Sequence, residues 1–302
     1  MTRGVYTGVN TGLAMAAGTS PSIAATPQRG PTGITILDHF TFAFQGANGD
    51  LWTDTGPACP PTRCHPVPPE GPADTGDRMA PGTSPSVTRA GDNPDAAGTA
   101  DGNYVAAYQG TDGHVWVQHS GQAAIEWANT PDNFMAPGTS PSISTVFPVP
   151  NVATAYYPIS FRGSNGDLWF TYQTGGLWIV PNEPGGGDTG SPVMAGTNPS
   201  VMVAPVDEPG LPLGGTSAYT GYVSSTGVVS LYGYNYYDNT TFELSTGQVA
   251  AGSPSIVSAV NWVDGGWSVG GTASAAHIRA GTRGSARGGG GSGPVTPTAE
   301  DH

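Results

Sequence analysis

An eight-residue phrase, MAPGTSPS, occurs twice in this sequence of 302 residues, at residues 79–86 and again at 135–142. Chance does not produce an identical octapeptide twice in a chain of this length, so the repetition indicates internal duplication. Related phrases are MAAGTSPS at 15–22, VMAGTNPS at 193–200 and VAAGSPS at 249–255. The sequence therefore contains five copies of one unit.

The proline of each Pro-Ser pair marks the period of the repeat. The intervals between Pro21, Pro85, Pro141, Pro199 and Pro254 are 64, 56, 58 and 55 residues. Five similar units indicate one repetitive array rather than separate domains. The units start near residues 18, 82, 138, 196 and 252, and the array covers residues 1–281. Residues 282–302 are rich in glycine and lack apolar residues that could anchor a core, so we expect a flexible tail.

Each unit has the pattern of a small antiparallel sheet. A short apolar strand follows the Pro-Ser pair, as in PSVTR at 85–89. A hairpin comes next, because aromatic alternation surrounds Asn-Gly or Asp-Gly at 40–56, 104–121 and 159–176. The copy at 217–235 keeps a turn at Thr226-Gly227 but has Ser230 in place of tryptophan. A polar piece before each phrase, such as ADTGDRMA at 73–80, predicts an outer strand.

Four strands per unit and five units predict an all-β fold, a five-bladed β-propeller with four-stranded blades. The sequence starts with the end of a repeat and stops after the beginning of one. We therefore expect the last blade to be closed by the N-terminal segment, residues 1–17. A β-trefoil needs three units, and the coils of a β-helix are shorter than 55 residues.

The charge of the chain excludes several partners. The net charge is −13, with nine arginines and no lysine, so the chain cannot build the basic surface that nucleic acid or an anionic membrane requires. No stretch approaches the ~20 apolar residues that span a bilayer. The apolar run at 13–17 is short and belongs to the first phrase, so no segment has the pattern of a signal peptide.

Motifs for catalysis or metal binding are not found. The sequence has neither the G-x-S-x-G nor the H-E-x-x-H pattern. His114 and His119 fall on opposite faces of one strand, and Asp50, Asp112 and Asp167 fall in or next to turns. We expect no catalytic residue, metal site or cofactor. A propeller glycosidase with central carboxylates is the enzymatic alternative.

Two insertions carry residues with chemistry of their own. Cys59 and Cys64 lie in a proline-rich insertion, CPPTRC, and a disulfide between them is the favoured interpretation, ahead of free thiols and of a metal site with His65. A disulfide implies an oxidising compartment, so we expect an extracellular or cell-surface protein. The acidic loop at 92–101 does not have the spacing of an EF-hand calcium loop.

A repeated aromatic and polar set gives the candidate binding residues. Sugar rings present apolar C–H faces and a rim of hydroxyls, so their sites combine a flat aromatic ring with amide, carboxylate or guanidinium groups. Packing between blades is the alternative role for each tryptophan. The three candidate sets are Trp52 with Gln45 and Asn48, Trp116 with Gln109 and Asp112, and Trp169 with Arg162 and Asn165.

The phrase G-T-S-P-S-I, followed by a strand ending in F-Q/R-G-x-N/D-G-x-L/V-W, resembles repeat arrays of bacterial secreted proteins, often accessory domains of hydrolases. The hairpin FRGSNGDLWF at 161–170 is similar to blades of bacterial propeller lectins that recognise fucose and methylated sugars. The five-unit count is like that of the tachylectin family. The W-W pair of the fucose-binding blades and a full tachylectin signature are missing.

The resemblance covers residues 1 to about 280, and it implies a non-catalytic, multivalent lectin. Sugars would occupy weak sites between adjacent blades at the three tryptophans, and the fourth and fifth units would have altered sites. Glycans or glycoproteins would be the partners of a monomer. A protein-interaction or structural scaffold is the alternative function.

Overall fold

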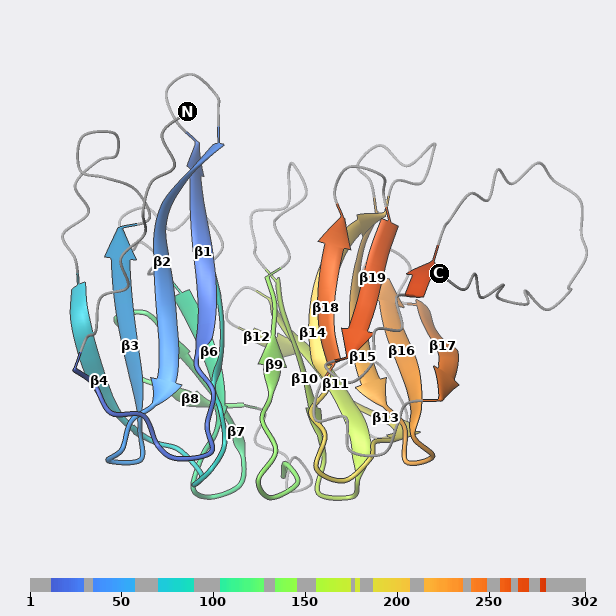
Figure 1. Cartoon of the computed structure of the whole chain (residues 1–302), viewed down its shortest axis with the longest axis horizontal. Coiled ribbons are helices and arrows are strands. Elements are labelled where there is room, and N and C mark those ends of the chain that lie inside the picture. The colour runs from blue at the N-terminus through green and yellow to red at the C-terminus, as the bar shows by residue number, and fades with distance from the viewer. Residues whose placement is uncertain are drawn as a thin grey trace, which may run out of the picture. The chain divides into compact units, whose positions relative to one another are not determined.

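The strands of this protein form five antiparallel sheets (Figure 1). The computed structural model describes residues 12–29, 35–57, 70–89, 104–127, 134–145, 156–174, 177–179, 187–206, 215–235, 240–248, 256–261, 266–271 and 278–280. Every regular element within these ranges is a β-strand, so the all-β prediction is confirmed. The chain divides into two compact units, 1–141 and 142–302, which are described separately.

The first unit contains two four-stranded sheets, each with its strands in sequence order. The first sheet consists of β1 (Ser22–Arg29), β2 (Thr35–Gln45), β3 (Asp50–Pro57) and β4 (Glu70–Arg78). The second sheet consists of β5 (Ser86–Arg89), β6 (Tyr104–Gln109), β7 (Val115–His119) and β8 (Ile125–Glu126). Both sheets confirm the predicted order of a first strand, a hairpin and an outer strand.

The second unit contains three sheets. The third sheet consists of β9 (Ser142–Ile143), β10 (Tyr156–Arg162) and β11 (Asp167–Thr174), with β12 (Leu177–Ile179) and β13 (Asp188–Pro192) both paired to β11. The fourth consists of β14 (Ser200–Val206), β15 (Gly215–Val223), β16 (Val228–Asn235) and β17 (Thr240–Gln248). The fifth consists of β18 (Ile256–Asn261), β19 (Gly266–Gly271) and β20 (Ile278–Ala280).

Two outer strands differ from the prediction. In the second sheet a two-residue outer strand lies at Ile125–Glu126, after a turn closed by a bond from Gln122 N–H to His119 O, and Phe134 of the predicted piece at 129–136 forms a β-bridge with His114. In the third sheet β13 pairs with only the beginning of β11, so β12 pairs with its end. The position of an outer strand therefore depends on which residues of β7 or β11 it can pair with.

Several predictions fall on residues outside the described ranges. These are the pair Cys59 and Cys64, the acidic loop at 92–101 and the tail at 282–302. The fourth strand expected for the fifth sheet was assigned to residues 1–17, of which the structure describes only 12–17. There Met15 forms a β-bridge with Gly46 of the first sheet.

The repeated phrase forms a turn of defined geometry. In the copy at 79–86, Gly82 follows Pro81 with a φ of +76°, as position three of a type II turn requires. The hydroxyl of Thr83, which is fully buried, donates to the Ala80 carbonyl at 2.7 Å. The same bond joins Thr19 to Ala16, Thr139 to Ala136 and Thr197 to Met194.

The serines of the phrase connect neighbouring sheets. The Ser84 hydroxyl accepts from the Ser20 N–H at 2.9 Å, and the Ser140 hydroxyl accepts from the Ser84 N–H at 2.8 Å. The second serine of the phrase accepts from the next sheet: Ser22 from Val87 N–H at 3.0 Å, and Ser142 from Val201 N–H at 2.9 Å. The repeated phrase thus supplies both the turn and the bonds from one sheet to the next.

In each unit, apolar side chains pack where two successive sheets meet face to face. Between the first and second sheets the cluster consists of Ala43, Leu51, Met79, Val87, Tyr104, Ala106 and Tyr108. Between the third and fourth sheets it consists of Leu168, Phe170, Tyr172, Val193, Val201, Ala218, Tyr222, Tyr232 and Tyr234. These two junctions are therefore parts of the core.

Candidate functional site

Three hairpins carry the predicted tryptophans, and we call them the aromatic hairpins: β2–β3 with Trp52, β6–β7 with Trp116, and β10–β11 with Trp169. In the first hairpin the Gly46 N–H donates to the Asp50 carbonyl oxygen, with 2.9 Å between nitrogen and oxygen, and three residues lie between Gly46 and Asp50. Gly49, the last of the three, has a φ of +88°. The Asn-Gly prediction of a hairpin is confirmed, with a loop of three residues.

Each tryptophan ring is fixed against the backbone of its own hairpin. The Trp52 Nε1–H donates to Asn48 Oδ1 at 3.0 Å, and a Cβ added to Gly46 would lie 2.4 Å from Trp52 Cδ1. The indole therefore covers a position that only glycine can occupy. The equivalent bonds join Trp116 to Asp112 Oδ2 at 3.0 Å and Trp169 to Asn165 Oδ1 at 3.2 Å.

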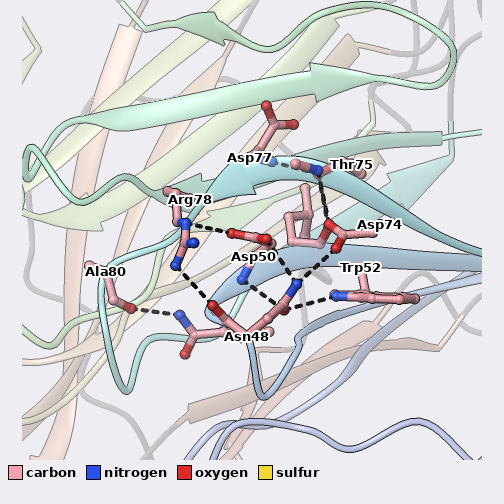
Figure 2. A network of polar contacts seen from close by, with 11 residues as sticks. Asn48, Asp50, Trp52, Asp74, Thr75, Asp77, Arg78 and Ala80 are labelled. Carbon is pink, nitrogen blue, oxygen red and sulfur yellow. Dashed lines mark hydrogen bonds and ion pairs between the residues drawn. The ribbon is translucent and has the colours of Figure 1, made fainter.

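A polar network surrounds Trp52 (Figure 2). The Asn48 amide donates to Asp50 Oδ2 and to Asp74 Oδ2, at 2.8 Å each. Asp74 Oδ1 accepts from the Gly76 N–H at 2.9 Å. Arg78 contributes its Nε, 2.9 Å from Asp50 Oδ1, and donates from Nη1 to the Asn48 carbonyl. The carboxylate of Asp74 is thus held from both oxygens while its side chain stays exposed.

The third hairpin repeats this network without the arginine. Asn165 Nδ2 donates to Asp167 Oδ2 at 3.1 Å and to Asp188 Oδ2 at 2.6 Å. Burial and the neighbouring charge of Asp188 raise the pKa of Asp167, against the opposing effect of Arg162. The network has a recognisable sequence signal, an Asp-Thr-Gly on the outer strand at 74–76 and 188–190. The prediction from the sequence was only that these residues form a strand.

The second hairpin reaches a related arrangement with different residues. Asp112 has no amide to donate, and its Oδ1 accepts from the His114 N–H at 3.0 Å. The His114 Nδ1 lies 2.9 Å from Glu126 Oε1, and its ring centre is 4.2 Å from that of Phe134. Glu126 stands directly across from Trp116 in the strand register. A carboxylate therefore again lies beside the indole.

The fourth hairpin lacks the tryptophan and every feature that goes with it. Ser224 stands in place of the covered glycine, Thr226 in place of Asn or Asp, and Ser230 in place of tryptophan. Ser245, across from Ser230, replaces the acid, and the two hydroxyl oxygens are 3.3 Å apart. Because a Cβ fits only where the indole is missing, the glycine and the tryptophan change together.

Two of the predicted site residues lie on the buried side of their hairpins. Gln45 is 1% exposed and donates to the Ala80 carbonyl at 3.0 Å, and Gln109 is 2% exposed and donates to Ala136 O at 3.3 Å. Arg162, at the same position, donates from Nε to Val193 O at 3.1 Å. Each of these side chains therefore joins its hairpin by a hydrogen bond to the repeated phrase that follows it in the sequence. The structure does not bring them together with the indoles.

The strand register explains this separation. A two-residue Asn-Gly loop would pair Gln45 with Trp52 and put both side chains on one face. The three-residue loop pairs Gln45 with Leu51 instead, so Gln45 and Trp52 point to opposite faces. One extra loop residue therefore moves the amide from the tryptophan side to the core.

The three tryptophans differ in exposure. Trp52 and Trp116 are half-buried, whereas Trp169 is only 5% exposed. Trp116 packs against the core cluster that the first and second sheets share, so it lies at the junction of these two sheets. Trp52 and Trp116 therefore present more of their rings to a ligand than Trp169 does.

Asp77 is a residue of this junction that the sequence analysis did not identify. Its Oδ2 atom is buried and has no hydrogen-bond partner among the described residues. Burial raises the pKa of Asp77, a hydrogen bond with Thr75 opposes the increase, and the charges of Asp50 and Asp74 add to it. Burial, together with the charges of Asp77 and Asp112, also raises the pKa of Tyr108 in the second sheet.

The corresponding junction in the second unit is closed by hydrogen bonds. Ser191, at the position of Asp77, donates to Glu243 Oε2 at 3.1 Å, and the Tyr222 hydroxyl donates to the other oxygen of the same carboxylate. Burial and the bond with Glu243 raise the pKa of Tyr222 to about 12. Among the described residues, a buried carboxylate oxygen without a hydrogen-bond partner is therefore found at the Asp77 junction, whereas both oxygens of the Glu243 carboxylate accept hydrogen bonds.

Within the part of the chain that the structure describes, no group of three or more His, Cys, Asp or Glu side chains is arranged to hold a metal ion. No helix in the same ranges has the length and apolar character needed to cross a membrane.

No protein-family model and no curated protein matches this sequence. Solved structures do resemble its fold. A triple arginine mutant of AofleA from Arthrobotrys oligospora is 15% identical, with a TM-score of 0.50, over 87% of this chain and 67% of that one. A single-site mutant of Aleuria aurantia lectin, bound to Fucα1-6GlcNAc, is 12% identical, with a TM-score of 0.49, over 84% and 72%.

Aleuria aurantia lectin is also described as a six-bladed β-propeller with a novel fucose recognition mode, in a structure that is 13% identical with a TM-score of 0.48, over 84% of this chain and 72% of that one. At these identities the likeness concerns the fold. The number of five blades stays a prediction.

Proposed function

We propose that this chain is a non-catalytic carbohydrate-binding protein, built as a five-bladed β-propeller whose last blade is completed by residues 1–17. Five repeated phrases and five sheets support the blade number. Sugars bind at the two aromatic hairpins whose indoles are half-buried, β2–β3 and β6–β7, between adjacent blades. The observation that carries the proposal is the pair of half-buried indoles, Trp52 and Trp116, each held rigidly beside a carboxylate.

The geometry suits weak and repeated sugar binding. An indole whose N–H is already bonded offers its apolar surface to the C–H face of a sugar, and fixed carboxylates accept from the hydroxyls. Because the indole is held before the ligand arrives, binding does not have to order it. Several such sites on one molecule raise avidity for a glycan-coated surface by ~100-fold or more.

The proposal includes the partners, the oligomeric state and the location of the protein. The partners are glycans or glycoproteins, bound by a monomer in an extracellular or cell-surface location. Fractionation of the native cells tests the location, and sedimentation equilibrium tests the monomer.

A glycan array followed by titration tests the function. We expect the folded protein to bind a class of glycans, and Trp116→Leu to remove about one site from the stoichiometry of a monovalent sugar. Leucine retains apolar cover over Gly110 but lacks the flat ring. Trp169→Leu is the matched control, because Trp169 is 5% exposed and its loss should lower stability without removing a site. A folded protein that binds no glycan on a broad array contradicts the proposal.

A protein-interaction scaffold is the second candidate function. The observation that favours it is the exposure of Phe242 (39%) and Leu244 (46%) on the outer strand β17. It predicts a folded protein that is negative on glycan arrays.

A further inference from the structure

The acids beside the indoles bear on the chemical class of the sugar. We propose that the aromatic hairpins select glycans that carry a protonated amino group, in preference to N-acetylated sugars and against acidic ones. This inference rests on the proposed function and adds a charge selectivity to the same sites.

A carboxylate accompanies the indole in every aromatic hairpin. The residue directly across from the tryptophan on the outer strand is Asp74 for Trp52, Glu126 for Trp116 and Asp188 for Trp169. In the fourth sheet, where the tryptophan is replaced by Ser230, the residue across from it is Ser245. The acid is therefore present where the indole is present and lost where the indole is lost.

These carboxylates are fixed and accessible. Asp74 is exposed although both of its oxygens accept hydrogen bonds, and the Glu126 side chain is 35% exposed. Each carboxylate oxygen has a further lone pair, and hydrogen bonds from neutral amides leave the negative charge in place. A charge held in this way does not have to be ordered when a ligand arrives.

The charge around Trp116 is strongly unbalanced. Asp112 accepts from the indole N–H, Glu126 lies directly across from Trp116 in the strand register, and the hairpin at 104–119 contains no arginine or lysine. The whole chain has a net charge of −13 and contains no lysine. An acidic sugar is repelled at such a site, whereas an ammonium group is attracted both by the carboxylates and by the face of the indole.

Three oligosaccharides of equal length test the selectivity: oligoglucosamine, its N-acetylated form and an oligouronate. Titrations are run at about pH 6 in low salt (about 50 mM) and high salt (about 500 mM), where the Debye length is shorter. We expect oligoglucosamine to bind at least tenfold more tightly than the N-acetylated form in low salt, with this ratio reduced at least threefold in high salt. The oligouronate should not bind.

Equal or tighter binding of the N-acetylated form, or binding of the oligouronate, overturns the charge selectivity and leaves the proposed function standing. Absence of binding to every glycan on the array overturns the proposed function itself. The two failures are therefore distinguishable.

A matched pair of variants locates the effect. Glu126→Gln removes the charge beside Trp116 and keeps an acceptor for His114, whereas Glu243→Gln removes the same charge from the fourth sheet, which has no tryptophan in its hairpin. We expect Glu126→Gln to lower the preference for oligoglucosamine about threefold and Glu243→Gln to leave it unchanged. Equal effects of the two variants would assign the preference to net charge alone and contradict a site. If Glu126→Gln fails to fold, the salt dependence of the wild type still decides.

Discussion

Gly110 and Trp116 depend on each other at the scale of single residues. A Cβ at Gly110 would lie 2.5 Å from Trp116 Cδ1, and the fourth hairpin has serine at both equivalent positions. We expect Gly110→Ser to cost about 2 kcal/mol through the clash and Trp116→Ser about 3 kcal/mol through lost packing. The double variant should cost at least ~1 kcal/mol less than the sum, because the serine occupies space that the ring has left. Denaturant unfolding measures the three energies, and additive values would show that the residues act independently.

Asp77 makes the stability depend on pH in a defined direction. Burial raises its pKa in the folded state above the ordinary value of 3.8, so the folded protein favours the protonated form. The contribution of Asp77 to stability is therefore complete below about pH 4 and is lost as the pH rises through the raised pKa. We expect Asp77→Asn to raise Tm at pH 7 relative to the wild type, with a smaller gain at about pH 4. A gain that is the same at both values would contradict an effect of ionisation.

The sequence predicts which residues recur in each unit, but it does not predict how buried each side chain is or on which face of the hairpin it lies. The structure brings Trp52 and Asn48 together, because they are close in one hairpin and their hydrogen bond forms within it, and their role in binding stays a prediction. Gln45 was grouped with them, yet it lies on the other face, because the loop has three residues and not two. Asp77 could not be found from its sequence, since its surroundings depend on a neighbouring sheet.

At the scale of elements, the phrase serines set the strength of the connection between sheets. The Ser22 hydroxyl accepts from the Val87 N–H, and the Val87 side chain is 6% exposed. We expect Ser22→Ala to cost about 1–2 kcal/mol, because the Val87 N–H is left without a partner. Thermal unfolding measures the loss, and hydrogen exchange of the Val87 amide should accelerate. Ser225→Ala, in an exposed hairpin loop, is the control that should change stability by less than about 0.5 kcal/mol.

The prediction of strands succeeded where the sequence has a local turn signal. It failed where the position of a strand depends on the neighbouring strand with which it pairs. The hairpins of β2–β3 and β10–β11 carry their own turn residues, so their strands were located from the sequence. The outer strands β8 and β12 are short, and their positions depend on which part of β7 or β11 is left unpaired. Such strands have no strong periodicity of their own.

At the scale of the whole molecule, the proposed closure by the N-terminal segment can be tested by deletion. We expect removal of residues 1–11 to lower Tm by several °C, because the last blade would lose its outer strand and the ring its closure. Removal of residues 282–302, the expected tail, should leave Tm unchanged. Equal Tm values for the two truncated proteins would contradict closure by the N-terminal segment.

The serine bonds of the repeated phrase also bear on how such a chain can change in evolution. The Ser84 hydroxyl accepts from the Ser20 N–H of the preceding phrase, and the Ser84 N–H donates to the Ser140 hydroxyl of the following phrase, so this copy is bonded to a neighbouring copy on each side. A contact of this head-to-tail kind does not define its own number of subunits. A duplicated unit arrives with both halves of its interface already compatible with its neighbours. In the proposed propeller, the number of blades is then limited by the angle at which the ring closes, and the gain or loss of one unit requires no new type of contact.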